Sequence, residues 1–127
     1  MAANDNYNQL VDRYIACWNE RDPEIRSKLV EEVWADDCTY YNRLFVAQGR
    51  ELMDFVIGRA HEEYYAKGFS FRSQSNAYGH HGGMQFNWVM ISTATGEVDT
   101  WGYDFVMLND EGKIRLDYQF NFKRPSV

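Results

Sequence analysis

The sequence is short of cysteine and of long apolar runs, and each shortage excludes a class of protein. Its 127 residues include 2 cysteines, Cys17 and Cys38, which form no CxxC motif and no spacing typical of a zinc site. We interpret both as small buried hydrophobic residues in a reducing cytosol, and we expect a cytoplasmic protein. Residues 1–20 contain charges and no apolar run of signal-peptide length, and the uncharged stretch of residues 84–96 is interrupted by polar side chains. We therefore predict no membrane partner.

Positive charge is also scarce. Lysine and arginine total 13 against 19 acidic residues, which gives a net charge of −6, and no basic run exists beyond Lys123-Arg124. Binding to a phosphate backbone depends on clustered Lys and Arg. The composition therefore argues against nucleic acid as a partner.

Motifs for metals, cofactors and covalent catalysis are missing as well. His80-His81 stands in a glycine-flanked turn, where adjacent side chains point to opposite faces, and His61-Glu62-Glu63 lacks the second histidine of HExxH. The sequence contains no Rossmann fingerprint and no Gly-x-Ser-x-Gly elbow. We expect no metal and no cofactor.

Aromatic side chains are in excess. They make up 17% of the chain, as 9 tyrosines, 8 phenylalanines and 4 tryptophans. One small core needs fewer, so we expect some of them to line a cavity or an interface. The length fits a single domain, residues 1–127, and no linker or internal repeat divides it.

The N-terminal half predicts three helices, near residues 5–20, 23–35 and 50–66. Asp22-Pro23 is a typical helix start, because Asp caps free N–H groups and Pro suits the first helical position. The third helix opens after Gly49 and closes at Gly68. The apolar residues of the first helix recur at the helical period, as Tyr7, Leu10, Val11, Tyr14, Ile15 and Trp18.

The C-terminal half predicts a β-meander. Four β-rich runs, near residues 70–78, 84–93, 97–108 and 114–122, are separated by short glycine-containing turns. Such turns require antiparallel neighbours, because parallel strands need a long crossover. Helices followed by a meander indicate an α+β domain with the helices on one face of the sheet.

Four blocks of sequence in this order resemble one superfamily. They are Val11-Asp-Arg-Tyr-Ile-Ala-Cys-Trp-Asn19, Trp34-Ala-Asp-Asp-Cys-Thr-Tyr40, Gln48-Gly-Arg-Glu51, and Gly102-Tyr-Asp-Phe105 followed by Gly112-Lys-Ile114. The chain resembles the nuclear transport factor 2-like superfamily, and within it the SnoaL-like polyketide cyclase and ketosteroid isomerase branches. The resemblance implies a cone-shaped, cystatin-like domain with three N-terminal helices packed on the concave face of a strongly curved antiparallel sheet. It does not imply one activity, because this fold hosts many.

The resemblance to ketosteroid isomerases suggests an oxyanion hole. Tyr14 matches the position of the family's oxyanion tyrosine, and Asp104 matches its protonated aspartic acid. The position of the family's base holds Asn42, and an amide cannot take a proton at neutral pH. The alternatives are that Tyr14 packs the core and that Asp104 is a surface residue.

The last predicted strand offers a second acid. In SnoaL-like cyclases the working carboxylate lies at the position that Gln119 occupies here, again an amide. Asp117 stands two residues earlier and, by strand alternation, on the same face, so we consider it a candidate base. The resemblance thus supplies Tyr14, Asp104 and Asp117 as candidate catalytic residues.

Strand alternation conflicts with simple burial. If Asp104 and Asp117 face the concave side, then Tyr103, Phe105, Tyr118 and Phe120 face the convex side, and a soluble monomer rarely exposes that much aromatic surface. We resolve the conflict with a homodimer through the convex sheet face, as many relatives of this fold use.

Three functions remain open from sequence. The first is a cofactor-free isomerase, cyclase or dehydratase on an apolar ketone-bearing molecule. The second is a non-catalytic ligand-binding domain that lost its base, and the third is a domain whose aromatic surface serves assembly. The residues expected to contact the small molecule are Trp18, Trp34, Tyr40, Asn42, Met53, Ile57, Phe71, Trp88 and Gln119.

Overall fold

Three helices precede most of the sheet, as predicted. The structure, a computed structural model, describes residues 2–123, with side chains from residue 6 to residue 121. Helix α1 is Ala2–Asn19, α2 is Pro23–Val33 and α3 is Arg50–Glu63, followed by a short 3-10 helix, η1, at Tyr65–Lys67. Among the residues described, no helix is long and apolar enough to cross a membrane.

The boundaries of α2 follow from local chemistry. Asp22 accepts a hydrogen bond from the Glu24 amide at 2.9 Å, and Pro23 takes the first helical position, where no N–H is needed. The helix ends at Val33, because Trp34 has extended backbone angles, φ −104° and ψ 141°. Arg50 fixes this change of direction by donating Nε and Nη2 to the Trp34 carbonyl at 3.2 and 3.1 Å.

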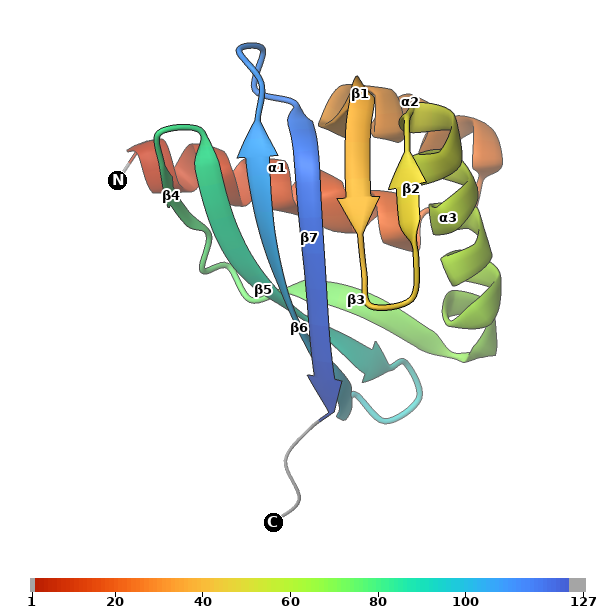
Figure 1. The fold of residues 1–127 in the computed structure, drawn as a ribbon. Helices are drawn as coiled ribbons and strands as arrows, with labels where there is room; N and C mark the ends of the chain where they lie inside the picture. Colours follow the sequence, from red (N-terminus) through yellow and green to blue (C-terminus); the bar gives the residue numbers. More distant parts are fainter. Residues whose placement is uncertain (1, 124–127) are drawn as a thin grey trace.

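Seven strands form one sheet within the described residues, in the order β2-β1-β7-β6-β5-β3, with β4 also paired to β5. Their bounds are β1 Trp34–Tyr41, β2 Val46–Gln48, β3 Phe69–Ser73, β4 Tyr78–His80, β5 Gly83–Ser92, β6 Val98–Leu108 and β7 Ile114–Lys123. The sheet curves, and the three helices lie on the side that it encloses (Figure 1). The predicted α+β cone is confirmed.

One strand pair departs from the antiparallel expectation. β1 runs parallel to β7, with Tyr40 opposite Asp117 and Tyr41 opposite Tyr118. The rule that short turns give antiparallel neighbours applies only to strands adjacent in sequence. Most of the chain separates β1 from β7, so the connection is long enough for a parallel pair.

The predicted strand 70–78 is divided in two. Ser75 adopts a left-handed backbone with φ 54°, and its amide bonds the Ser73 hydroxyl at 2.9 Å, a local turn that interrupts the strand. Asn76 then ties the kink to β5 through hydrogen bonds to Asn87. Both halves, β3 and β4, still pair with β5.

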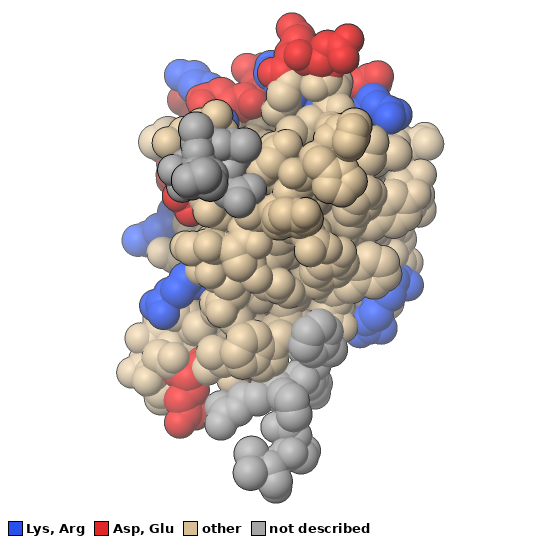
Figure 2. Space-filling model, turned by 90° about the vertical axis from the view of Figure 1, so that its left-hand side faces the viewer, with Lys and Arg blue, Asp and Glu red and all other residues tan. Residues whose placement is uncertain are grey.

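One side of the molecule carries little charge. Seen from the side on which β4 lies, a broad area lacks Lys, Arg, Asp and Glu, which gather at its edges (Figure 2). On the convex faces of β6 and β7, Phe105 is 37%, Tyr118 38% and Phe120 55% exposed. Tyr103, in the same row, is half-buried.

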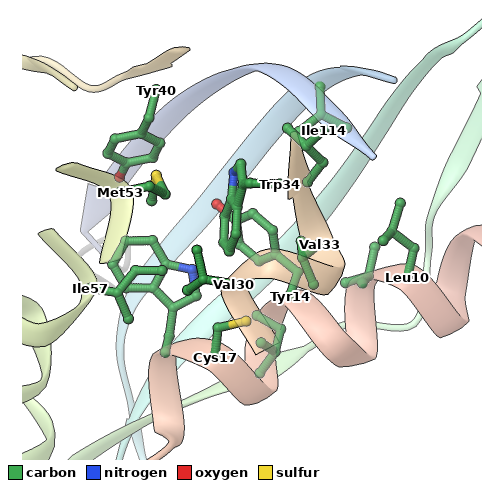
Figure 3. Close-up of a cluster of buried hydrophobic side chains, with 14 of the residues drawn as sticks. Leu10, Tyr14, Cys17, Val30, Val33, Trp34, Tyr40, Met53, Ile57 and Ile114 are labelled. Carbon is green, nitrogen blue, oxygen red and sulfur yellow. The ribbon is translucent and has the colours of Figure 1, made fainter. Parts of the chain in front are cut away.

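The core lies between the helices and the concave face. Figure 3 shows side chains from all three helices meeting those of β1 and β7. The fully buried members come from α1, α2, α3, β1, β6 and β7, and they include Val11, Cys17, Val30, Val33, Trp34, Met53, Ile57, Val106 and Ile114.

Candidate functional site

Two aspartic acids and one tyrosine meet at the buried end of the concave face. Asp104 on β6 and Asp117 on β7 are both 0% exposed. Tyr14 of α1 places its hydroxyl oxygen 2.9 Å from Asp104 Oδ2 and 2.8 Å from Asp117 Oδ2. The structure thus brings together the three residues predicted as catalytic, although they lie 90 and 103 positions apart in sequence.

These three groups must hold a shared proton. The Tyr14 hydroxyl has one hydrogen and can donate it to one carboxyl oxygen, so the contact with the other carboxyl needs a proton from that carboxyl. Burial raises the pKa of Asp117 well above its ordinary value, and the charge of Asp104 raises it further. Burial also raises the pKa of Asp104, while hydrogen bonds from Asp117, Trp88 and Tyr14 lower it. Asp104 therefore ionises first, and Asp117 keeps its proton to higher pH.

The same environment acts on neighbouring tyrosines. Burial, followed by the charges of Asp104 and Asp117, raises the pKa of Tyr14 well above its ordinary value of 10.0. Burial and the same two carboxyls raise the pKa of Tyr40. Both phenols therefore stay protonated and can act as hydrogen-bond donors.

Trp88 holds Asp104 in place, and a glycine makes this possible. The Trp88 indole donates Nε1–H to Asp104 Oδ1 at 2.7 Å. The indole lies across Gly102, its partner on β6, where an added Cβ would stand 1.9 Å from Trp88 Cε2. Only glycine leaves room for the ring at that position.

Trp34 and Asp117 form a looser contact. Trp34 lies close enough to lower the pKa of Asp117, the weakest of the influences on it. Yet neither Trp34 Nε1 nor Asp117 Oδ1 has a partner of hydrogen-bond geometry among the described residues. The contact between the two side chains is therefore not a hydrogen bond.

A cavity of about 1130 Å³ opens beside this cluster. Such a volume accommodates a molecule of several rings. Of the residues predicted as catalytic or as ligand contacts, seven lie on its wall: Tyr14, Trp18, Tyr40, Asn42, Phe71, Trp88 and Gln119.

Five other predicted residues are absent from that wall. Asp104 was expected to face the cavity, but the two side chains that bond it, Tyr14 and Trp88, line the cavity in its place. Asp117, the candidate base, is likewise withdrawn behind Tyr14. Trp34, Met53 and Ile57 are 0% exposed in the packed core.

Helix α3 explains why Met53 and Ile57 were misplaced. Met53 and Ile57 lie on the face of the helix that enters the core. The neighbouring face, with Leu52, Phe55 and Val56, lines the cavity. The available signal was the exposed position of Leu52 and Phe55 on a helical wheel, which alone does not distinguish a cavity wall from solvent.

Asn42 shapes the edge of the cavity through its side chain. Its side-chain oxygen accepts hydrogen bonds from the amides of Leu44 at 2.9 Å and Phe45 at 3.0 Å. This turn shapes the loop between β1 and β2. The oxygen at the position where the resembled family has its base is therefore used inside the loop.

Several polar groups on the wall have no partner. Gln119 and Asn121 of β7 line the cavity, and neither side chain forms a hydrogen bond within the described part of the chain. These two amides are therefore available to a bound molecule. Trp18 also lines the cavity, but its Nε1, which has no partner among the described residues, is itself buried.

Histidines and cysteines do not assemble near this cavity. His80 and His81 contact each other through Nδ1 atoms 3.0 Å apart in the β4–β5 turn. Within residues 2–123, no group of three or more His, Cys, Asp or Glu residues is placed to hold a metal ion.

The sequence matches no protein-family model and no curated protein. Its structure is similar to that of a candidate polyketide cyclase from Sinorhizobium meliloti, with TM-score 0.67 and 12% identity, covering 88% of this chain and 94% of that one. It is also similar to a nuclear transport factor 2-like protein of unknown function from Exiguobacterium, with TM-score 0.70 and 17% identity, covering 91% and 99% of the two chains. At these identities the likeness shows the fold alone.

A third solved structure is more similar in sequence. It is a candidate isomerase of the SnoaL-like family from Agrobacterium tumefaciens, with TM-score 0.84 and 30% identity, and the match covers 91% of this chain and 97% of that one. Agreement of sequence and fold over nearly the whole of both chains shows that this chain belongs to the SnoaL-like family of the nuclear transport factor 2-like superfamily.

Proposed function

We propose that this chain binds a small, largely apolar, ketone-bearing molecule in its cavity and acts on it as a cofactor-free isomerase or cyclase. The observation that carries the proposal is Tyr14, a residue of the cavity wall whose hydroxyl oxygen lies within 2.9 Å of both buried carboxyls. Burying two acids costs free energy that apolar side chains of similar size would not cost, so core packing alone does not account for the pair.

The chemistry follows from the proton arrangement. With both buried carboxyls protonated, Asp104 and Asp117 each donate a hydrogen bond to the Tyr14 oxygen, and the Tyr14 O–H is free to turn toward the ligand carbonyl. As a C–H bond next to that carbonyl breaks, the electron pair moves to the carbonyl oxygen, where this chain of donors stabilises the negative charge. The released proton passes to water, and reprotonation at another carbon completes an isomerisation.

One observation favours the second candidate, a binding domain without turnover. No carboxylate contacts the cavity next to Tyr14: the wall carries Glu63 and Asp99, and Asp99 stands five positions before Asp104 on β6, about 15 Å along a strand. Glu63 is moreover paired with Lys67 at 3.3 Å. Binding is common to both candidates, and the presence of a base separates them.

Hydrogen–deuterium exchange tests the two candidates. A β,γ-unsaturated bicyclic ketone is incubated in D₂O with the protein, and exchange next to the carbonyl is followed by NMR. We expect exchange above the protein-free rate, reduced about a hundredfold in Tyr14→Phe, because one oxyanion donor is lost. Circular dichroism checks that the variant is folded. Binding without exchange would support the binding domain and reject the enzyme.

A further inference from the structure

The cavity carries two arginines with no acidic partner. Arg43, in the loop between β1 and β2, and Arg59, in the C-terminal half of α3, both line it. Neither forms an ion pair with any residue in the described part of the chain, in a protein whose net charge is −6. Both side chains are exposed. Two unpaired cations on the wall of one cavity are unexpected in so acidic a chain.

The acids on the same wall are already engaged. Glu63 pairs with Lys67 at 3.3 Å, and Asp99 Oδ2 accepts a hydrogen bond from the Thr100 hydroxyl at 2.7 Å. The Thr100 hydroxyl leaves the charge of Asp99 in place, so among the described residues one unpaired acid stands on the wall against two unpaired arginines.

The loop that carries Arg43 is held in shape. Asn42 accepts hydrogen bonds from the amides of Leu44 and Phe45, and its own amide donates to the Phe45 carbonyl at 3.1 Å. Arg43 lies inside this turn. A charged side chain on a preformed turn loses less entropy when it binds a ligand than one on a loose loop.

The rest of the wall is apolar and reaches the surface. Six large apolar side chains that line the cavity remain strongly exposed, with Leu44 at 71% and Phe55 at 62%; the others are Phe45, Val46, Leu52 and Tyr64. An apolar body bound in the cavity would cover these exposed side chains.

We infer that the ligand is an amphipathic carboxylic acid, with its apolar body in the cavity and its carboxylate between Arg43 and Arg59. The inference rests on the proposed function and names the class of molecule that the site accepts. Guanidinium groups match carboxylates in geometry as well as in charge. The carbonyl that Tyr14 holds is then at the opposite end of the molecule from the acid.

The test compares three probes of equal chain length: decanoate, decan-1-ol and decylammonium. Binding is measured by calorimetry and by tryptophan fluorescence, since Trp18 and Trp88 line the cavity. We expect decanoate to bind about tenfold tighter than decan-1-ol, and decylammonium to bind weakest. Added salt should weaken decanoate binding and leave decan-1-ol unchanged.

Arginine variants assign the effect to the site. Arg43→Gln and Arg59→Gln should each weaken decanoate binding about three- to tenfold and leave decan-1-ol unchanged. Arg72→Gln, an exposed arginine of β3 that does not line the cavity, should change neither probe.

The outcomes separate the inference from the proposed function. Equal binding of decanoate and decan-1-ol, or unchanged preference in both arginine variants, overturns the carboxylate site while the cavity remains a binding site. Failure of all three probes to bind removes the cavity as a ligand site, and the proposed function falls with it.

Discussion

At the scale of single residues, Tyr14, Asp104 and Asp117 show how a protein keeps two acids out of water. Each carboxyl is fully buried, and no cation neutralises either of them among the residues described. Two negative charges at this separation would repel strongly, so the pair retains at least one proton, and hydrogen bonds from Tyr14 and Trp88 support the carboxyl that ionises first.

This arrangement predicts a loss of stability at higher pH. In the folded chain the pKa of each carboxyl is raised above the ordinary 3.8, at which it ionises in the unfolded chain. Above that value the folded state binds more protons than the unfolded state, so the free energy of unfolding falls as pH rises, by at most about 1.4 kcal/mol per pH unit for each proton. Urea unfolding from about pH 5 to about pH 9 measures this slope.

Asp117→Asn should flatten that slope, because an amide keeps a donor for Tyr14 and does not ionise. Asp12→Asn, at an exposed position of α1, is the matched control and should leave the slope unchanged. Equal slopes in the parent and in Asp117→Asn would contradict the shared-proton arrangement.

Gly102 offers a second test at this scale. In Gly102→Ala the new Cβ would stand 1.9 Å from Trp88 Cε2, so the indole must move and lose its bond to Asp104. We expect a loss of about 2–5 kcal/mol of stability, measured by urea unfolding. Combining the change with Trp88→Phe should recover part of the loss, because the smaller ring leaves room. Strict additivity of the two changes would show that the contact is not the cause.

At the scale of elements, β6 and β7 carry two functions on opposite faces. Alternation along each strand places Asp104 and Asp117 inward, and Phe105 and Tyr118 outward. The register pairs Asp104 with Gln119 and Gly102 with Asn121, which extends a polar stripe from the buried acids along the cavity wall. A prediction from hydrophobicity alone would have turned the aromatic rows of both strands inward and the two acids outward.

The Asn42 side chain shapes the loop between β1 and β2. Asn42→Ala removes the acceptor for two amides and should cost about 1 kcal/mol of stability, with weaker decanoate binding because Arg43 is less well held. Asn42→Asp keeps the acceptor and should behave as the parent in both assays, without new exchange activity. Gain of exchange in Asn42→Asp would show that this position reaches the ligand as a base.

At the scale of the whole molecule, the convex face exposes aromatic side chains. Tyr118 stacks on Tyr41 with ring centroids 4.5 Å apart, and Tyr103 contacts Phe120 at 6.0 Å, yet Phe105, Tyr118 and Phe120 stay more than a third exposed. The neighbouring surface carries little charge (Figure 2). We propose that a second copy of the chain covers this face.

A dimer through this face should bury more than about 1,200 Å² in total. Light scattering at high micromolar concentration should therefore give twice the monomer mass, and Phe120→Asp should give the monomer, because a charge would be buried without a partner. Phe55→Asp, an exposed aromatic at the cavity mouth, serves as control and should leave the dimer intact. A monomeric parent chain would contradict this proposal.

Local pattern was sufficient for much of the fold. The period of Leu10, Val11, Tyr14 and Ile15 predicted α1, and Asp22-Pro23 predicted the start of α2, because helix faces and caps depend on nearby residues. The kink at Ser75 was not predicted, because it depends on a hydrogen bond from the neighbouring Asn76 to Asn87, which lies on another strand. The parallel pair of β1 with β7 escaped because sequence order says nothing about strands that are distant along the chain.

The candidate site likewise has features that the sequence predicts and features that depend on the tertiary structure. The sequence by itself determined which side chains share a face of one strand, since alternation is a property of the backbone. The resemblance to the family then indicated that Asp104 and Asp117 face the concave side. Only the tertiary structure decided that Tyr14 and Trp88 stand between those acids and the cavity, and that Arg43 and Arg59 open onto it. Depth within a cavity depends on contacts between segments far apart in sequence, and no local pattern encodes those contacts.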